Sequence, residues 1–118
     1  MDKAKTALKS QREMLARALR FVERVKAKIN VAEVYVVGSR ARGDYTNESD
    51  IDLVIISDDV KGLDALERRL LLKDLLEPGV EYFIYTSEEW SRGDSLWIAQ
   101  LRREAKELGQ LAREYLST

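Results

Sequence analysis

Apolar residues recur at helical spacing over the first quarter of the chain. Four of them lie seven residues apart: Leu8, Leu15, Val22 and Ile29. This spacing predicts one long helix from residue 3 to about residue 29. The helix either packs entirely on its own domain or turns part of its apolar face to a partner chain. A second copy of the chain is one such partner, so a homodimer is among our expectations.

Three short apolar runs in the rest of the chain predict strands. They cover residues 32–37, 51–57 and 80–86, and the first two are apolar on both faces, as in strands that are covered on both sides. Segments with helical spacing follow at about 63–76 and from 87 to 115. Strands that alternate with helices predict an α/β (α+β) fold: a small mixed sheet of three or four strands flanked by helices.

The two later helical segments carry apolar faces that we expect to be buried. In segment 63–76 this face consists of Leu63, Leu66, Leu70, Leu71 and Leu75. In segment 87–115 the buried stripe consists of Trp97, Leu101, Leu108, Leu111, Ala112 and Tyr115. Thr86 and Glu89 form a helix-start signature, and Gly93 predicts a break in the helix near residues 92–94.

The composition excludes several classes of chemistry. The 118 residues include no cysteine and no histidine, so disulfides, zinc–thiolate sites and a Ser-His-Asp triad are impossible. Twenty basic and 21 acidic residues give a net charge of −1, which does not indicate a dedicated nucleic-acid surface. The sequence has neither a run of about 18 apolar residues nor an apolar leader, so we expect a cytoplasmic protein with no membrane partner.

A glycine–serine turn joins the first predicted strand to a short helical segment. Gly38 and Ser39 would present backbone N–H groups and a hydroxyl where the helical residues 40–42 begin, and a glycine follows them. Free N–H groups and the positive end of a helix dipole together form a cradle for phosphate. Arg40 and Arg42 stand beside this turn and could neutralise the charge of a triphosphate.

Two aspartates open the second predicted strand. Asp50 and Asp52 would project side by side, about 6.5–7 Å apart along the strand, while Ile51 and Leu53 face the other side. Such carboxylates repel each other, and a divalent metal is the usual compensation.

A third acid, Glu81, lies on the next predicted strand and could complete a three-carboxylate site. Such a site can hold two Mg²⁺ ions ~3.5–4 Å apart and serve phosphoryl transfer. A carboxylate there can also accept the proton of an attacking hydroxyl. Glu81 equally fits an ordinary half-exposed position of a strand.

The ordered combination of strand, Gly-Ser turn, short helix and Asp-X-Asp strand resembles the nucleotidyltransferase superfamily that includes DNA polymerase beta. The segments GSRARG (38–43) and SDIDL (49–53) look like those of the minimal nucleotidyltransferases of bacteria and archaea. The resemblance implies one nucleotidyltransferase domain over residues 1–118. It would comprise an N-terminal helix (1–30), a palm-like core (31–86) and C-terminal helices (87–118).

The resemblance also implies roles for the site residues. Gly38 and Ser39 would bind the triphosphate of an NTP, Asp50 and Asp52 would bind Mg²⁺, and a third acid would complete the site. At that third position relatives often carry aspartate, whereas this chain has Glu81. The longer side chain bears on catalysis more than on the binding of metal or nucleotide.

Relatives of this size resemble one half of a toxin–antitoxin pair whose other half is a small helical protein of the HEPN type. By resemblance, the chain would be the antitoxin and would transfer AMP from ATP to a tyrosine hydroxyl of that partner, with Mg²⁺ as cofactor. An alternative is a catalytically weak or inactive antitoxin or scaffold that binds a helical partner by contact. A nucleotide or metal sensor without transfer is a third reading.

Overall fold

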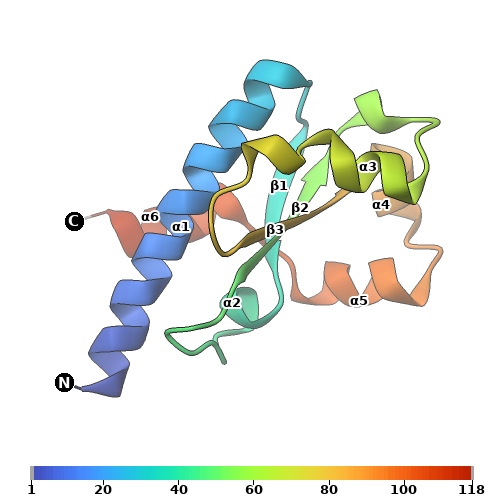
Figure 1. The fold of residues 1–118 in the computed structure, drawn as a ribbon. Coiled ribbons are helices and arrows are strands. Elements are labelled where there is room, and N and C mark those ends of the chain that lie inside the picture. The colour runs from blue at the N-terminus through green and yellow to red at the C-terminus, as the bar shows by residue number, and fades with distance from the viewer. Residues whose placement is uncertain (1, 118) are drawn as a thin grey trace.

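A computed structural model describes residues 2–117, and within this range four strands form one mixed sheet in the order β3-β2-β1-β4 (Figure 1). The strands are β1 (Glu33–Val37), β2 (Ile51–Ile56), β3 (Val80–Tyr85) and β4 (Lys106–Glu107). β1 runs antiparallel to β2 and β4, whereas β2 and β3 are parallel. The expected fold class, a small mixed sheet flanked by helices, is confirmed.

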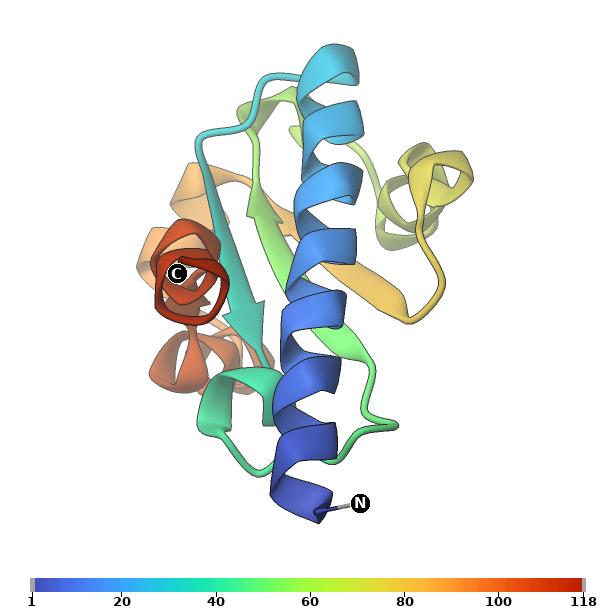
Figure 2. The ribbon, with the colours of Figure 1, turned by 90° about the vertical axis from the view of Figure 1, so that its left-hand side faces the viewer.

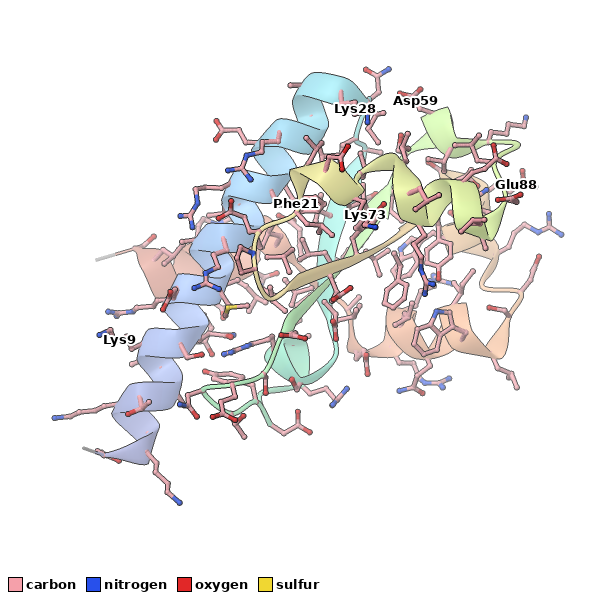
Figure 3. All side chains as sticks on the ribbon, in the orientation of Figure 1. Lys9, Phe21, Lys28, Asp59, Lys73 and Glu88 are labelled. Carbon is pink, nitrogen blue, oxygen red and sulfur yellow. The ribbon has the colours of Figure 1, made fainter. Side chains whose placement is uncertain are left out.

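The predicted long helix is α1 (Lys3–Lys28), which lies across one face of the sheet (Figure 2). Its first turn is capped by Asp2, whose carboxylate accepts a hydrogen bond from the Ala4 N–H at 3.0 Å. Phe21 of α1, which Figure 3 labels, is buried in the core between α1 and the sheet, with its ring centroid 5.7 Å from that of Tyr82 on β3. α6 (Leu108–Leu116) packs beside α1 and adds Leu108 and Leu111 to the same core. In residues 2–117 neither α1 nor any other helix has the length and apolar character needed to cross a membrane.

The opposite face of the sheet is covered by α4 (Ser87–Arg92) and α5 (Leu96–Glu104). Trp90 of α4 stacks on Tyr35 of β1 with ring centroids 5.3 Å apart. Leu101 of α5 joins Trp90 in a core with the strand residues that point to this side, among them Val54. Because both faces are covered, β1 and β2 carry apolar side chains on both sides, as the sequence predicted.

The predicted helical segment from residue 87 to residue 115 is interrupted twice, and only the first interruption was expected. Gly93 adopts φ +60° and ends α4, which confirms the expected break. A second break follows α5, where Ala105 is extended and residues 106–107 pair with β1 as β4. The two residues of β4 are both charged and exposed, so they show none of the alternation that marks a longer strand.

The predicted helix from 63 to 76 is α3 (Ala65–Leu71) followed by a short 3-10 turn, η2 (Lys73–Leu75); another such turn, η1 (Asp58–Val60), follows β2. The expected leucine face is wrong in part, because Leu66 is 63% exposed and Leu70 is 53% exposed. Leu72 is the buried leucine of this segment. Trp97 on α5 is also 52% exposed and leaves the predicted buried stripe.

Candidate active site

The candidate site lies where β1 ends and β2 and β3 begin. Val37, the last residue of β1, pairs with Asp52 on β2, and Asp52 pairs with Glu81 on β3. The register therefore brings the Gly38 turn and two of the predicted acids to one edge of the sheet. Residues two apart share a face, so Asp52 lies on the side of Val54, the side that α4 and α5 cover. Ile51 and Leu53 belong to the opposite core, as predicted.

Gly38 makes the close approach of the turn to Asp52 possible. Its backbone has φ +73° and ψ −157°, which an L side chain rarely adopts. A Cβ atom at this position would lie 2.8 Å from Oδ2 of Asp52. The turn then enters α2 (Ser39–Arg42), which ends at the left-handed Gly43. The glycine and the short helix stand where the sequence placed them.

Asp52 is half-buried among like charges. Burial raises the pKa of its carboxyl group, and the nearby carboxylates of Asp50, Glu81 and Glu104 raise it further, while Arg42 partly offsets them. Asp50 and Glu81 are exposed. In residues 2–117, none of the three predicted acids forms an ion pair. This set of negative groups at one edge is the kind that a bound cation compensates.

The donor set fits a hard divalent cation, since carboxylate oxygens are the ligands that Mg²⁺ takes in proteins. As the side chains stand, no three acidic side chains within the described residues are grouped closely enough to hold a metal ion. Asp50 and Glu81, being exposed, have room to change rotamer. Asp50, Asp52 and Glu81 are therefore the residues that would hold Mg²⁺, and that assignment stays a prediction.

Arg40 does not face the site, in contrast to its expected role beside a triphosphate. Its side chain is 1% exposed, and its guanidinium donates to the Ser49 carbonyl at 2.6 Å and to the Ser10 hydroxyl at 2.7 Å. It also donates to the side-chain oxygen of Gln11, whose amide donates back to the Arg40 carbonyl. Burial lowers the pKa of this guanidinium, although nearby Tyr45 and Asp50 raise it. Arg40 thus fastens α1 to the segment that leads into β2.

Arg42 does lie at the site, where it contacts Glu104, a residue that the sequence did not single out. Its Nη1 donates to Oε2 of Glu104 at 3.0 Å, and its Nε lies 3.4 Å from Oδ2 of Asp44. Oε1 of Glu104 accepts from the Gly38 N–H at 2.8 Å. These hydrogen bonds, above all the one to Glu104, raise the pKa of the Arg42 guanidinium. Glu104 lies in a stretch of mixed charges, residues 102–107, and no local pattern in the sequence sets it apart.

Two cavities flank the acids. One, of about 330 Å³, lies between α1 and the segment that leads into β2, and Asp50 is in its wall. The other, of about 870 Å³, is a groove between α3 and β3. Its wall combines the exposed Leu66 and Leu70 with Phe83 and reaches Glu81. Lys73, labelled in Figure 3, stands on the α3 side of this groove. One cavity thus reaches Asp50 and the other reaches Glu81.

Comparisons with known proteins agree with this architecture. Residues 19–112 match the family model described as "Nucleotidyltransferase domain". A protein of Methanocaldococcus jannaschii named "putative protein adenylyltransferase" is 45% identical over 56 residues, which are 45% of this chain and 56% of that relative's length. A crystal structure of a "putative nucleotidyltransferase" from Sulfolobus solfataricus superposes with a TM-score of 0.75 and 31% identity, over 91% of this chain and 89% of the other.

Proposed function

The chain belongs to the nucleotidyltransferase domain family, and on that premise we propose that it transfers AMP from ATP to a hydroxyl group. The observation that carries the proposal is the register that sets Asp52 beside Glu81 and against the Gly38 turn. An acidic pair next to a glycine turn suits phosphoryl transfer better than any other chemistry open to a chain without histidine and cysteine.

In the proposed reaction the acceptor oxygen forms a bond to the α-phosphorus of ATP. The bond from that phosphorus to the bridging oxygen breaks, and pyrophosphate leaves. The proton of the acceptor hydroxyl passes to a carboxylate of the site. Asp50, Asp52 and Glu81 are the carboxylates that this edge of the sheet offers for the step.

The remaining site residues would bind the triphosphate and the metal ion and neutralise the charge of the phosphates. The Gly38 turn and Ser39 would donate to phosphate oxygens, and Arg42 would pair with the charge that develops on the leaving pyrophosphate. Asp50, Asp52 and Glu81 would hold Mg²⁺, which when bound supplies a Lewis acid for the phosphate oxygens. We assign Arg40 no contact with the nucleotide, because its guanidinium is enclosed by protein oxygens.

The acceptor that we propose is a tyrosine of a helical partner protein of the HEPN type, with this chain as the antitoxin of the pair. Two observations support a protein acceptor. The Methanocaldococcus relative is named for adenylyl transfer to protein. The groove between α3 and β3 leads past apolar side chains to Glu81, so a polypeptide could reach the acids along it.

Replacement of the site carboxylates by amides tests the enzymatic proposal. The double variant Asp50→Asn/Asp52→Asn should lose transfer of label from α-labelled ATP in the presence of MgCl₂ and the partner, and Asp52→Asn alone should lower the rate by about 100-fold or more. Asp74→Asn, a matched change at an exposed aspartate on η2, should leave the rate unchanged. Both site variants should unfold no more easily than the native chain, because they remove repulsion. Full transfer by the double variant would refute the mechanism.

A second candidate function is neutralisation of a helical partner by contact alone. It is supported by the leucines of α3, which face the groove without cover, and by the basic side chains of Arg69 and Lys73 in the wall of the same groove. The double aspartate variant separates the two functions. Neutralisation that survives in that variant supports contact, whereas toxicity that returns supports transfer of AMP.

A further inference from the structure

We infer that Glu104 occupies the phosphate-binding position of the site and sets its affinity, so that a nucleotide binds only by displacing this carboxylate. The inference rests on the proposed function, since it takes the Gly38 turn and Arg42 as ligands of a triphosphate. It adds a residue that lies on α5, outside the segments that carry the recognised motifs.

The contacts of Glu104 are those that an anionic ligand would use. Its Oε1 accepts from the backbone N–H of Gly38 at 2.8 Å, and its Oε2 accepts from Nη1 of Arg42 at 3.0 Å. The Glu104 side chain is only 10% exposed, whereas that of Arg42 is 47% exposed. Backbone N–H groups and arginine recognise carboxylate and phosphate in the same way. A triphosphate that binds these two groups must therefore break both hydrogen bonds of Glu104.

The carboxylate of Glu104 lies near another carboxylate, that of Asp52, which repels it. This repulsion makes it easier for a ligand to displace Glu104. Glu104 is one of three carboxylates near that of Asp52, together with Asp50 and Glu81. Besides Gly38 and Arg42, the one further donor to Glu104 in residues 2–117 is the Gln100 amide, at 3.5 Å. A ligand that also carried a cation to the acids would relieve this repulsion, whereas Glu104 cannot.

The backbone at Glu104 limits how the carboxylate can leave. Glu104 is the last residue of α5, and Ala105 after it packs in the core of that face of the sheet. Lys106 and Glu107 then pair with β1. Because both sides of Glu104 are fixed, displacement is a rotation of its side chain. The effect of Glu104 should then appear in ligand affinity and leave the fold unchanged.

Calorimetric titration of the full chain with ATP and MgCl₂ tests the inference, with inorganic tripolyphosphate as a second probe that has no base or sugar. Glu104→Gln keeps an acceptor for the Gly38 N–H but removes the competing charge. It should bind both probes tighter, by about fivefold or more. The control is Glu107→Gln, which removes the same charge from an exposed residue of β4 and should leave both dissociation constants as in the native chain.

The outcomes separate this inference from the proposed function. Tighter binding of both probes by Glu104→Gln alone supports it. Native binding that Glu104→Gln leaves unchanged or weakens overturns it while the proposed function stands, since Glu104 would then be neutral or itself a ligand. Equal tightening in Glu107→Gln also overturns it, because net charge alone would explain the gain. If the native chain and both variants bind neither probe, the proposed function fails and this inference fails with it.

Discussion

At the scale of single residues, Arg40 is a buried cation whose hydrogen bonds all go to neutral oxygen acceptors and whose guanidinium lies over an aromatic ring. Its guanidinium lies 4.7 Å from the ring centroid of Tyr45 and donates to the Ser49 carbonyl. On the other side it contacts Gln11 of α1. These contacts join segments that are 29 residues apart in sequence. The residue thus sets the position of α1 against the segment that carries Asp50.

Arg40→Leu should lower the free energy of unfolding by roughly 3 kcal/mol, because it strands the Ser49 carbonyl and the Gln11 side chain, whose hydrogen bonds to a charge are each strong. Arg42→Leu makes the same change on the same helix at an exposed position, where ion pairs contribute at most about 1 kcal/mol. Urea unfolding followed by circular dichroism measures both. Equal losses in the two variants would show that Arg40 has no special structural role.

The residues that the sequence identified are those whose signal is local. Gly38 directly follows an apolar strand, and Asp52 lies at the start of the next one. Their neighbours in the sequence are therefore enough to identify them. Glu104 lies 66 residues from Gly38, and its contact depends on how α5 packs on the sheet. The prediction for Arg40 was wrong for a similar reason. Its position next to Gly38 and Ser39 suggested a contact with phosphate, but its guanidinium is buried against Gln11 of α1.

At the scale of elements, the start of α4 is stabilised by a capping box that is also tied to α3. Glu89 accepts from the Thr86 N–H at 2.8 Å and from Nη1 of Arg68 at 2.6 Å. Burial alone would raise the pKa of the Glu89 carboxyl group, but the hydrogen bonds from Arg68 and Thr86 outweigh it and lower the pKa from its ordinary value of 4.5. One carboxylate thus links two helices across the sheet edge.

The stabilisation from Glu89 should depend on pH. Because its folded pKa is lowered, its contribution is fully present above the unfolded value near 4.5 and is lost as the pH falls through the lower, folded value. At pH 7, Glu89→Gln should cost about 1 kcal/mol or less, since glutamine still caps but no longer carries charge. The difference from the native chain should shrink between pH 4.5 and lower pH in urea titrations.

Glu88→Gln is the matched control for this prediction, because Glu88 pairs with Arg92 on an exposed helix surface. Its cost should be within about 0.5 kcal/mol at every pH. A Glu89→Gln penalty that stays constant down to pH 3.5, or about one unit below the ordinary carboxyl value, would contradict the assigned cause.

Elements with a strong period were predictable, and the short ones were not. α1, β2 and β3 follow from spacing and apolar runs, and the Thr86 capping box follows from its residue types. β4 has two charged residues and forms only because β1 offers it an open edge. The separation of α5 from α6 depends on that pairing, so the helical pattern across residues 96–116 could not show it.

At the scale of the whole molecule, the two faces of the sheet and its β3 edge have different tasks. The α1 and α6 face holds the larger core, while the α4 and α5 face ends at the acidic edge. α3 lies beside β3, where the Tyr82 hydroxyl holds it to the sheet by bonding to backbone groups of Arg68 and Leu72. The sequence predicted a sheet flanked by helices, but amphipathic spacing could not tell that the α3 leucines face a groove instead of the core.

Since Leu66 and Leu70 line the groove and are exposed, we expect them to matter for binding of a partner and little for folding. Leu66→Ser/Leu70→Ser should lower the free energy of unfolding by less than about 1 kcal/mol, because both side chains already contact water. Leu72→Ser, the same change at a fully buried leucine, should cost about 3–5 kcal/mol. Thermal unfolding of the variants measures the contrast, and a double variant as unstable as Leu72→Ser would show that the α3 leucines are packed.

The same double variant tests whether the groove receives the proposed helical partner. Loss of two apolar contacts should weaken binding of the partner by about tenfold or more, as measured by surface plasmon resonance. Binding of ATP should stay as in the native chain, because neither leucine lies near the Gly38 turn or α2. Unchanged affinity for the partner would place its contact elsewhere, and the exposed leucines would then have no part in delivering an acceptor to Glu81.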